Sequence, residues 1–250
     1  MSDMVKEKTD GRIIEAKELT VGYAHRAVVS DMDFSVRRGE IVALIGENGS
    51  GKSTLLKTVT GAIPAISGRI FIEGTGMEKL TAGDIARKMS IVMTRNVSPA
   101  YFTCRDMVSS GRYPYTGFFG KLKERDEAAV EEAMHLTGTE ELMDQYMTDI
   151  SDGQRQLVML ARAIAQEPGA LILDEPTSFL DIRHKLLFSD TVRSLAEERR
   201  LAVMMSIHEL ELVREMSDRI IALKDGSIDR QGSTSDVLTD GYIRELFRLG

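Results

Sequence analysis

The fold of this chain is decided by the stretch Ile41-Val42-Ala43-Leu44-Ile45-Gly46-Glu47-Asn48-Gly49-Ser50-Gly51-Lys52-Ser53. Residues 41–45 are an apolar run that predicts a buried strand, and the glycine-rich turn after them leads into a helix predicted over 53–60. Because glycine lacks a Cβ atom, several backbone N–H groups can converge on one anion at the positive end of the helix dipole. Lys52 adds a full positive charge. The stretch therefore predicts a cradle for the phosphates of a nucleoside triphosphate.

The composition is that of an ordinary globular protein of 250 residues, 42% of them hydrophobic. A net charge of −7 disfavours a broad nucleic-acid surface, which needs a clustered excess of lysine and arginine. Cys104 is the only cysteine, so the chain can form neither an internal disulfide bond nor a cysteine-based zinc site. The apolar stretches are shorter than the roughly 20 residues that span a bilayer, so any membrane association must go through a partner.

The hydropathy pattern divides the chain into a polar tail over 1–12 and one domain over 13–250. Short β-type runs dominate 13–94, apolar residues at helical spacing dominate 95–166, and strands alternate with helices over 167–235. Residues 236–250 are expected to form a C-terminal helix. The expected strands are 13–21, 32–36, 41–45, 68–74, 89–93, 170–173, 201–206 and 219–223, and the expected helices include 124–136, 140–146, 153–166, 182–198 and 209–216. This alternation predicts an α/β fold with a mainly parallel sheet and an α-helical insertion.

A second apolar run, residues 170–173, ends in the carboxylates Asp174 and Glu175. In a parallel sheet such strand ends face the ligand crevice beside the phosphate loop. Ser53 and Asp174 are therefore candidate ligands of Mg²⁺, and Glu175 is the candidate group that polarises an attacking water. Taken alone, two acids after a strand also suit a solvated strand end. The phosphate cradle favours the catalytic interpretation.

The segment 149–156 precedes the last helix of the insertion, and Ser151 with Gln154 forms a capping box, a common way to begin a helix. Together with the cradle and the carboxylates, this segment makes the chain resemble the nucleotide-binding subunits of ABC transporters. Their Leu-Ser-Gly-Gly-Gln signature is matched here by Ile150 to Gln154. The resemblance covers residues 13–235 and implies a P-loop NTPase fold with a RecA-like core and an N-terminal antiparallel β subdomain.

The resemblance implies that the cofactors are ATP and Mg²⁺, and it assigns a role to each matching position. Tyr23 would stack on adenine, and Lys52, Glu175 and His208 would be catalytic. The other ATP-binding residues would be Gly46, Glu47, Asn48, Gly49, Ser50, Gly51, Ser53 and Thr54 in the cradle, with Ser151, Gly153, Gln154 and Asp181 facing the ATP of a second subunit.

Three of these residues also suit purely structural roles. Tyr23 equally suits packing on its own sheet, and Asp181 suits the N-cap of the following helix. His208 suits a helix start, where Ser206 and Glu209 predict a second capping box. The histidines without a comparable placement, to which no role is assigned, are His25, His135 and His184.

Two positions depart from the family pattern. Asp152 replaces the first glycine of the signature and brings a carboxylate near the place where a partner's γ-phosphate would dock. If this carboxylate points away, Ser151 and Gly153 remain able to donate hydrogen bonds. Thr94-Arg95-Asn96 stands where the family has a glutamine that touches magnesium and senses the membrane partner.

Two further segments resemble the ATPases of importers for iron siderophores, haem and vitamin B12. They are Gly111-Arg112-Tyr113-Pro114-Tyr115 and the stretch Thr177 to Leu186. This resemblance implies a head-to-tail homodimer at the cytoplasmic face of the cell membrane, bound to integral-membrane permease subunits and served by an extracytoplasmic substrate-binding protein. The expected docking surface for the permease is Arg95 to Arg112.

Two other functional classes are alternatives to transport. A non-transport ABC ATPase acting on nucleic acid or ribosomes is disfavoured by the acidic charge and by the lack of a tandem copy or coiled coil. A P-loop kinase acting on a small molecule gives no reason for a second phosphate-binding segment at Ser151.

Overall fold

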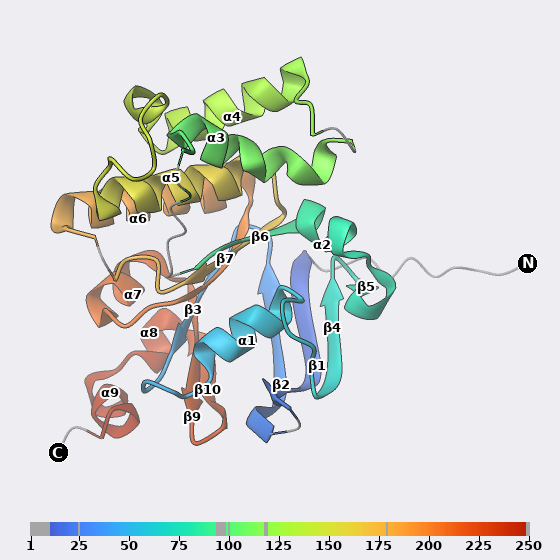
Figure 1. Cartoon of the computed structure of the whole chain (residues 1–250). Coiled ribbons are helices and arrows are strands. Elements are labelled where there is room, and N and C mark those ends of the chain that lie inside the picture. The colour runs from blue at the N-terminus through green and yellow to red at the C-terminus, as the bar shows by residue number, and fades with distance from the viewer. Residues whose placement is uncertain are drawn as a thin grey trace, which may run out of the picture.

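The computed structural model describes residues 11–24, 26–93, 99, 101–117, 120–178 and 180–248. In these residues a six-stranded sheet and a four-stranded sheet are combined with a layer of helices (Figure 1). The α/β fold with a mainly parallel core, an antiparallel β part and a helical insertion is confirmed.

The core sheet has the strand order β10-β9-β3-β8-β7-β6. All its neighbours pair in parallel except β9 and β10. Three central strands are buried along their whole length, which explains their nearly continuous apolar sequences. The strands are β3 (Ile41–Ile45), β6 (Met89–Val92), β7 (Ala170–Asp174), β8 (Ala202–Ser206), β9 (Arg219–Lys224) and β10 (Ser227–Ser233). Sequence analysis did not find β10, because this edge strand is mostly exposed and carries polar residues.

The second sheet is antiparallel and has the order β2-β1-β4-β5. Its strands are β1 (Arg12–Tyr23), β2 (Arg26–Arg37), β4 (Ser67–Ile72) and β5 (Thr75–Gly76). β1 begins at Arg12, which the sequence had placed in the tail. Helix α1 (Lys52–Val59) contributes Leu55, Leu56 and Val59 to the apolar core that this sheet shares with one face of the core sheet.

The two faces of the core sheet belong to different apolar clusters. Val42 and Leu44 of β3 pack in the cluster that includes α1 and the antiparallel sheet, whereas Ala43 and Ile45 pack in the cluster that includes the helical layer. This alternation follows from the period of two residues along a strand. The phosphate loop therefore leaves a strand that is enclosed on both faces.

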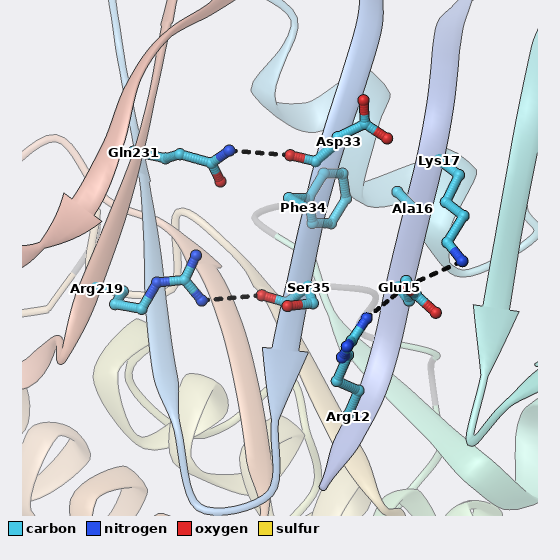
Figure 2. Close-up of a pocket in the computed structure, with 9 residues that line it drawn as sticks. All are labelled: Arg12, Glu15, Ala16, Lys17, Asp33, Phe34, Ser35, Arg219 and Gln231. Carbon is cyan, nitrogen blue, oxygen red and sulfur yellow. Dashed lines mark hydrogen bonds and ion pairs between the residues drawn. The ribbon is translucent and has the colours of Figure 1, made fainter. Parts of the chain in front are cut away.

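The antiparallel sheet and the core sheet are also joined by polar contacts around a cavity of about 300 Å³ (Figure 2). Arg219 of β9 donates to the backbone oxygen of Ser35 at 3.1 Å, and Gln231 of β10 donates to that of Asp33 at 3.0 Å. Both acceptors belong to β2. The residues around this cavity include none of the sequence-predicted site residues, so its contacts serve to hold the two sheets together.

The helical layer lies above the core sheet in Figure 1 and contains α3 (Cys104–Ser109), α4 (Glu124–Leu136) and α5 (Asp152–Ala165). The helix predicted over 140–146 is only a 3₁₀ turn, Glu140–Leu142, because Tyr146 instead forms an antiparallel bridge with Thr103. The remaining helices are α2 (Ala82–Lys88), α6 (Ile182–Arg199), α7 (Leu210–Met216), α8 (Thr234–Val237) and α9 (Asp240–Leu246).

The C-terminal region differs from its prediction, because α8 and α9 replace the single helix expected over 236–250. Thr239 separates them, and its hydroxyl caps α9 by accepting from the Tyr242 N–H. Across the part of the chain that the structure describes, every helix is too short or too polar to cross a lipid bilayer.

Candidate functional site

The carboxyl ends of three adjacent strands bring the predicted catalytic residues together. β3 leads into the phosphate loop, β7 ends at Asp174 before Glu175, and β8 ends at Ser206 before His208. In the sheet β8 lies between β3 and β7, and its Ser206 is paired in register with Leu44 and with Asp174. Strand order thus places side chains from distant parts of the sequence at one sheet edge.

The phosphate loop adopts the backbone conformation that its glycines allow. Gly51 has φ 102°, and a Cβ atom there would overlap the side chains of Val28 and Val29. The hydroxyl of Ser50 is buried and has no hydrogen-bond partner among the described residues. Glycine at position 51 therefore lets the loop pack closely against β2, and the Ser50 hydroxyl is available to a phosphate oxygen in front of α1.

Lys52 is 5% exposed, and its ammonium donates to the backbone oxygens of Gly46 at 2.8 Å and Glu47 at 3.0 Å. Burial lowers the pKa of Lys52, while the negative charges of Glu175 and Asp174 act in the opposite direction. The cation is therefore held against the loop, inside its curve, at the place expected for a phosphate ligand.

Ser53 and Asp174 lie together, as predicted for a magnesium site. The Ser53 hydroxyl donates to Oδ1 of Asp174 at 2.9 Å, and Asp174 is 5% exposed. A hydroxyl and a carboxylate side by side supply the oxygen ligands that Mg²⁺ prefers.

Glu175 is fixed by its backbone. Its φ of 48° lies in the left-handed region, which is uncommon for a residue with a side chain. Its N–H donates to the Ser206 hydroxyl at 2.9 Å, and that hydroxyl donates to Asp174 at 2.8 Å. Oε1 of Glu175 lies 2.6 Å from Nε2 of His208. The structure therefore brings Asp174, Glu175 and His208 into one hydrogen-bonded chain through Ser206.

Tyr23 lies beside the phosphate-loop helix at the end of β1. Its side chain is 49% exposed, and its hydroxyl oxygen is 3.5 Å from that of Thr54. An exposed ring next to the phosphate cradle offers a face on which a purine could stack.

The Ser151 segment forms the capping box that the sequence predicted. The Gln154 N–H donates to the Ser151 hydroxyl at 3.3 Å, and the Ser151 N–H donates to Oε1 of Gln154 at 2.9 Å. Gly153 lies in the first turn of α5. The carboxylate of Asp152 is exposed and pairs with Arg155 of the same helix.

Asp181 is the N-cap of α6, accepting from the His184 N–H at 2.9 Å. The N-cap predicted at this position is confirmed. Figure 1 shows α5 in the helical layer and α1 well apart from it, on the other side of the core sheet. The structure therefore gathers the cradle, the carboxylates and His208, and it leaves Ser151, Gly153 and Gln154 at a separate place. Residues 94–96, the departure from the family glutamine, lie outside the described residues.

Sequence analysis missed the role of Ser206, and its second capping box is wrong. The Ser206 side chain joins Asp174 to Glu175, and the N-cap of α7 is Glu209, which makes no capping hydrogen bond. Glu209 instead accepts from Thr177 at 3.2 Å and from Lys185 at 2.6 Å. A serine at the end of a buried strand beside an acidic strand end was the available signal.

Arg112 is not part of a docking surface, contrary to the expectation for 95–112. It is 1% exposed and donates to Asp126 at 3.0 Å, to the backbone oxygen of Ala165 at 2.6 Å and to Glu167 at 2.8 Å. Its guanidinium also lies over the ring of Tyr115, 4.2 Å from the centroid. Arg112 therefore anchors α4 to the end of α5, and its charge is paired with Asp126 and Glu167.

Comparisons with known proteins agree with this geometry. The sequence profile of the ABC transporter family matches residues 29–178. An uncharacterized ABC transporter ATP-binding protein of Methanocaldococcus jannaschii is 38% identical, over 95% of this chain and 82% of its own length. The iron(3+)-hydroxamate import ATP-binding protein FhuC of Bacillus subtilis is 34% identical, over 94% of this chain and 88% of its own length. A solved ABC transporter described as metal-chelate type, in an inward-facing conformation, has a TM-score of 0.84 at 28% identity, covering 95% of this chain and 90% of the other. The chain thus belongs to the ABC transporter family, as one of its ATP-binding, ATP-hydrolysing subunits.

Proposed function

We propose that this chain hydrolyses ATP to power an importer of metal chelates, the class that includes iron siderophores, haem and vitamin B12. The observation that carries the ATPase part is the cluster of Lys52, Ser53, Asp174 and Glu175, which lie at or after the carboxyl ends of β3 and β7 on either side of β8. Support for the substrate class comes from the iron-hydroxamate import relative and from the metal-chelate transporter.

Each residue of the cluster has a task in phosphoryl transfer. The backbone N–H groups of the phosphate loop and Lys52 bind the β- and γ-phosphates, and Ser53 and Asp174 hold Mg²⁺. The ion, when bound, neutralises charge on the phosphates. Glu175 orients and polarises the attacking water, and His208, which contacts Glu175, contacts the γ-phosphate. Tyr23 stacks on the adenine.

In the part of the chain that the structure describes, the Ser151–Gln154 segment lies apart from the phosphate loop, which supports a head-to-tail homodimer. The side chains of Ser151 and Gln154 each accept a hydrogen bond from the other residue's backbone N–H at an exposed helix start, away from α1. In the dimer, Ser151, Gly153, Gln154 and Asp181 of one subunit face the ATP in the cradle of the other. Two such subunits act on integral-membrane permease subunits at the cytoplasmic face of the membrane, and a substrate-binding protein delivers the chelate from the opposite side.

The first experiment measures ATP binding and ATP hydrolysis for Lys52→Ala. Loss of the cation nearest the phosphates should abolish tight binding or turnover. Lys57→Ala, in the last turn of the same helix, is the matched control and should keep both. Unchanged hydrolysis in Lys52→Ala would contradict the assignment of the cradle.

The second experiment tests the substrate class. The subunit is co-purified with its permease partners, reconstituted in vesicles, and supplied with ferric hydroxamate, ferric catecholate, haem or cobalamin together with the substrate-binding protein. ATP-dependent uptake of one of these chelates is expected. Uptake of an unrelated solute, with none of the chelates transported, would contradict the proposed class while leaving the ATPase assignment intact.

A further inference from the structure

The start of α5 and the start of α6 meet at His184. A Cβ atom added to Gly153 would lie 2.9 Å from Cγ and 2.9 Å from Nδ1 of the His184 ring, closer than real Cβ contacts. The imidazole therefore occupies the space that any side chain at position 153 would need. Packing within one chain, rather than the backbone conformation of the helix, explains why a glycine stands there.

The His184 ring is held in this position by Asp181. The His184 N–H donates to Oδ1 of Asp181 at 2.9 Å, and Nδ1 of the ring lies 2.9 Å from the same oxygen. These hydrogen bonds, the backbone one first, lower the pKa of Asp181. The His184 side chain is only 24% exposed, whereas that of Asp181 is 66% exposed. In this position the ring contacts Asp181 through Nδ1 while it lies beside Gly153.

Gly153 and Asp181 belong to the two segments proposed to face the ATP of a second subunit. Gly153 lies in α5 and Asp181 precedes α6, and the chain between them runs through the core strand β7. Their relative position therefore depends on packing. The His184 side chain lies against Gly153 and bonds to Asp181. It was assigned no role from the sequence, because a histidine in the first turn of a helix has no distinctive pattern.

We infer that His184 is a positioning residue that locks the Ser151–Gln154 segment to Asp181, the N-cap of α6, so that both reach the partner's nucleotide as one rigid unit. The inference rests on the proposed head-to-tail dimer. His184 itself need not touch ATP. It acts through Gly153, whose N–H belongs to the start of α5, and through Asp181.

A double-mutant cycle tests the contact and its consequence for dimerisation. The parent protein is Glu175→Gln, which is expected to retain ATP, and Gly153→Ala, His184→Ala and their combination are added to it. The dissociation constant of the ATP-bound dimer is measured by analytical ultracentrifugation. The affinity of the monomer for a fluorescent ATP analogue and the melting temperature are measured in parallel.

Gly153→Ala should weaken the dimer by roughly tenfold, because the new Cβ displaces the ring from Asp181. His184→Ala should weaken it by a few-fold. Adding Gly153→Ala to His184→Ala should cost less than about a further twofold, since the ring is no longer there to displace. The nucleotide affinity of the monomers should be unchanged, because neither residue faces the cradle of its own chain.

The matched control is His135→Ala. His135 also pairs with a carboxylate, Glu140, but its side chain is 78% exposed, and it should leave the dimer unaffected. An equal loss from Gly153→Ala with and without His184 would overturn the inference, as would weaker nucleotide binding by the His184→Ala monomer. If the parent protein fails to dimerise with ATP, the proposed dimer falls and the positioning role falls with it, whereas non-additive melting temperatures would still establish the contact.

Discussion

The two phosphate-facing parts of this chain are built in opposite ways. In the first part, the cradle with its carboxylates, Lys52 and Asp174 are each 5% exposed; Lys52 bonds to the backbone of the phosphate loop, and Asp174 bonds to Ser206 of the neighbouring strand. The Ser151 and Asp181 segments lie at exposed helix starts, where the side chains of Asp152 and Asp181 are 67% and 66% exposed. A site completed within one chain can be buried when the chain folds, whereas a site that awaits a second chain must stay at the surface.

The difference also concerns the kind of interaction. In the cradle region, hydrogen bonds join residues that are distant in sequence, such as Ser53 with Asp174 and His208 with Glu175. At the two helix starts the hydrogen bonds join residues three apart, as in Ser151 with Gln154 and Asp181 with His184. Substitutions in the cradle should therefore alter chemistry within a subunit, and substitutions at the helix starts should alter association.

The largest expected effect is that of Glu175→Gln, which tests the enclosed part. Loss of the carboxylate that polarises water should lower kcat by about 10²–10⁴-fold, while ATP still binds and traps a dimer. Steady-state ATPase rates and size-exclusion chromatography with ATP measure the two outcomes. Glu211→Gln, an exposed residue of α7, is the control. Hydrolysis at the rate of the unmodified protein would assign the water-polarising role to another residue.

The next largest effect concerns the packing of α4 against α5, the helix that begins after Ser151. Arg112→Ala should lower the free energy of unfolding by about 3 kcal/mol, because it leaves the carboxylate of Asp126 buried without its cation. Chemical denaturation measures it. Arg125→Ala is the control, since Arg125 also pairs with Glu167 but its side chain is 78% exposed.

The effect of Arg112→Ala should depend on pH in a defined direction. A backbone hydrogen bond from Lys123, opposed by burial and aided by Arg112, lowers the pKa of Asp126. A carboxyl whose pKa is lower in the folded protein stabilises it above the pKa of the unfolded chain, and this contribution is lost as the pH falls through the folded value. The difference in stability between Arg112→Ala and the unmodified protein should therefore shrink in acid. A constant difference across that range would show that Arg112 acts by packing alone.

A smaller effect is expected for Ser206→Ala, which removes the bridge between Asp174 and Glu175. A hydrogen bond to a charged group is worth roughly 1.5–3 kcal/mol, so the ATPase rate should fall by roughly tenfold to a hundredfold. Ser217→Ala, which removes another buried hydroxyl whose partners are Val213 and Thr234, should leave the rate unchanged. Equal rates for both variants would mean that the strand ends position the carboxylates without Ser206.

The smallest effect is expected for Asp152→Asn, in the exposed part. Because the carboxylate pairs with Arg155 on its own helix, removing its charge should change the affinity of the ATP-bound dimer by less than about twofold. Sedimentation at low and high salt measures this. A marked tightening confined to low salt, where repulsion is least screened, would show that Asp152 faces the partner's phosphate.

The sequence was most informative where the functional residues are contiguous in the chain. The glycine loop after an apolar strand, the two acids after another strand, and the capping box at Ser151 each depend on neighbours within a few positions. Each pattern depends on local backbone geometry, so it can be recognised without knowledge of the tertiary structure. The polar edge strand β10 and the 3₁₀ turn at Glu140–Leu142 were mispredicted, because hydropathy carries little information in exposed segments.

By itself, the sequence determined the phosphate cradle, the order of strands and helices through most of the core, and the family that these motifs resemble. Only the tertiary structure decided that Ser206 joins Asp174 to Glu175, that Arg112 is buried, and that the ring of His184 fills the space beside Gly153. The physical reason is that such contacts arise from the order of strands in the sheet and from the packing of separate helices. Neither is encoded in the residues adjacent to the side chains concerned.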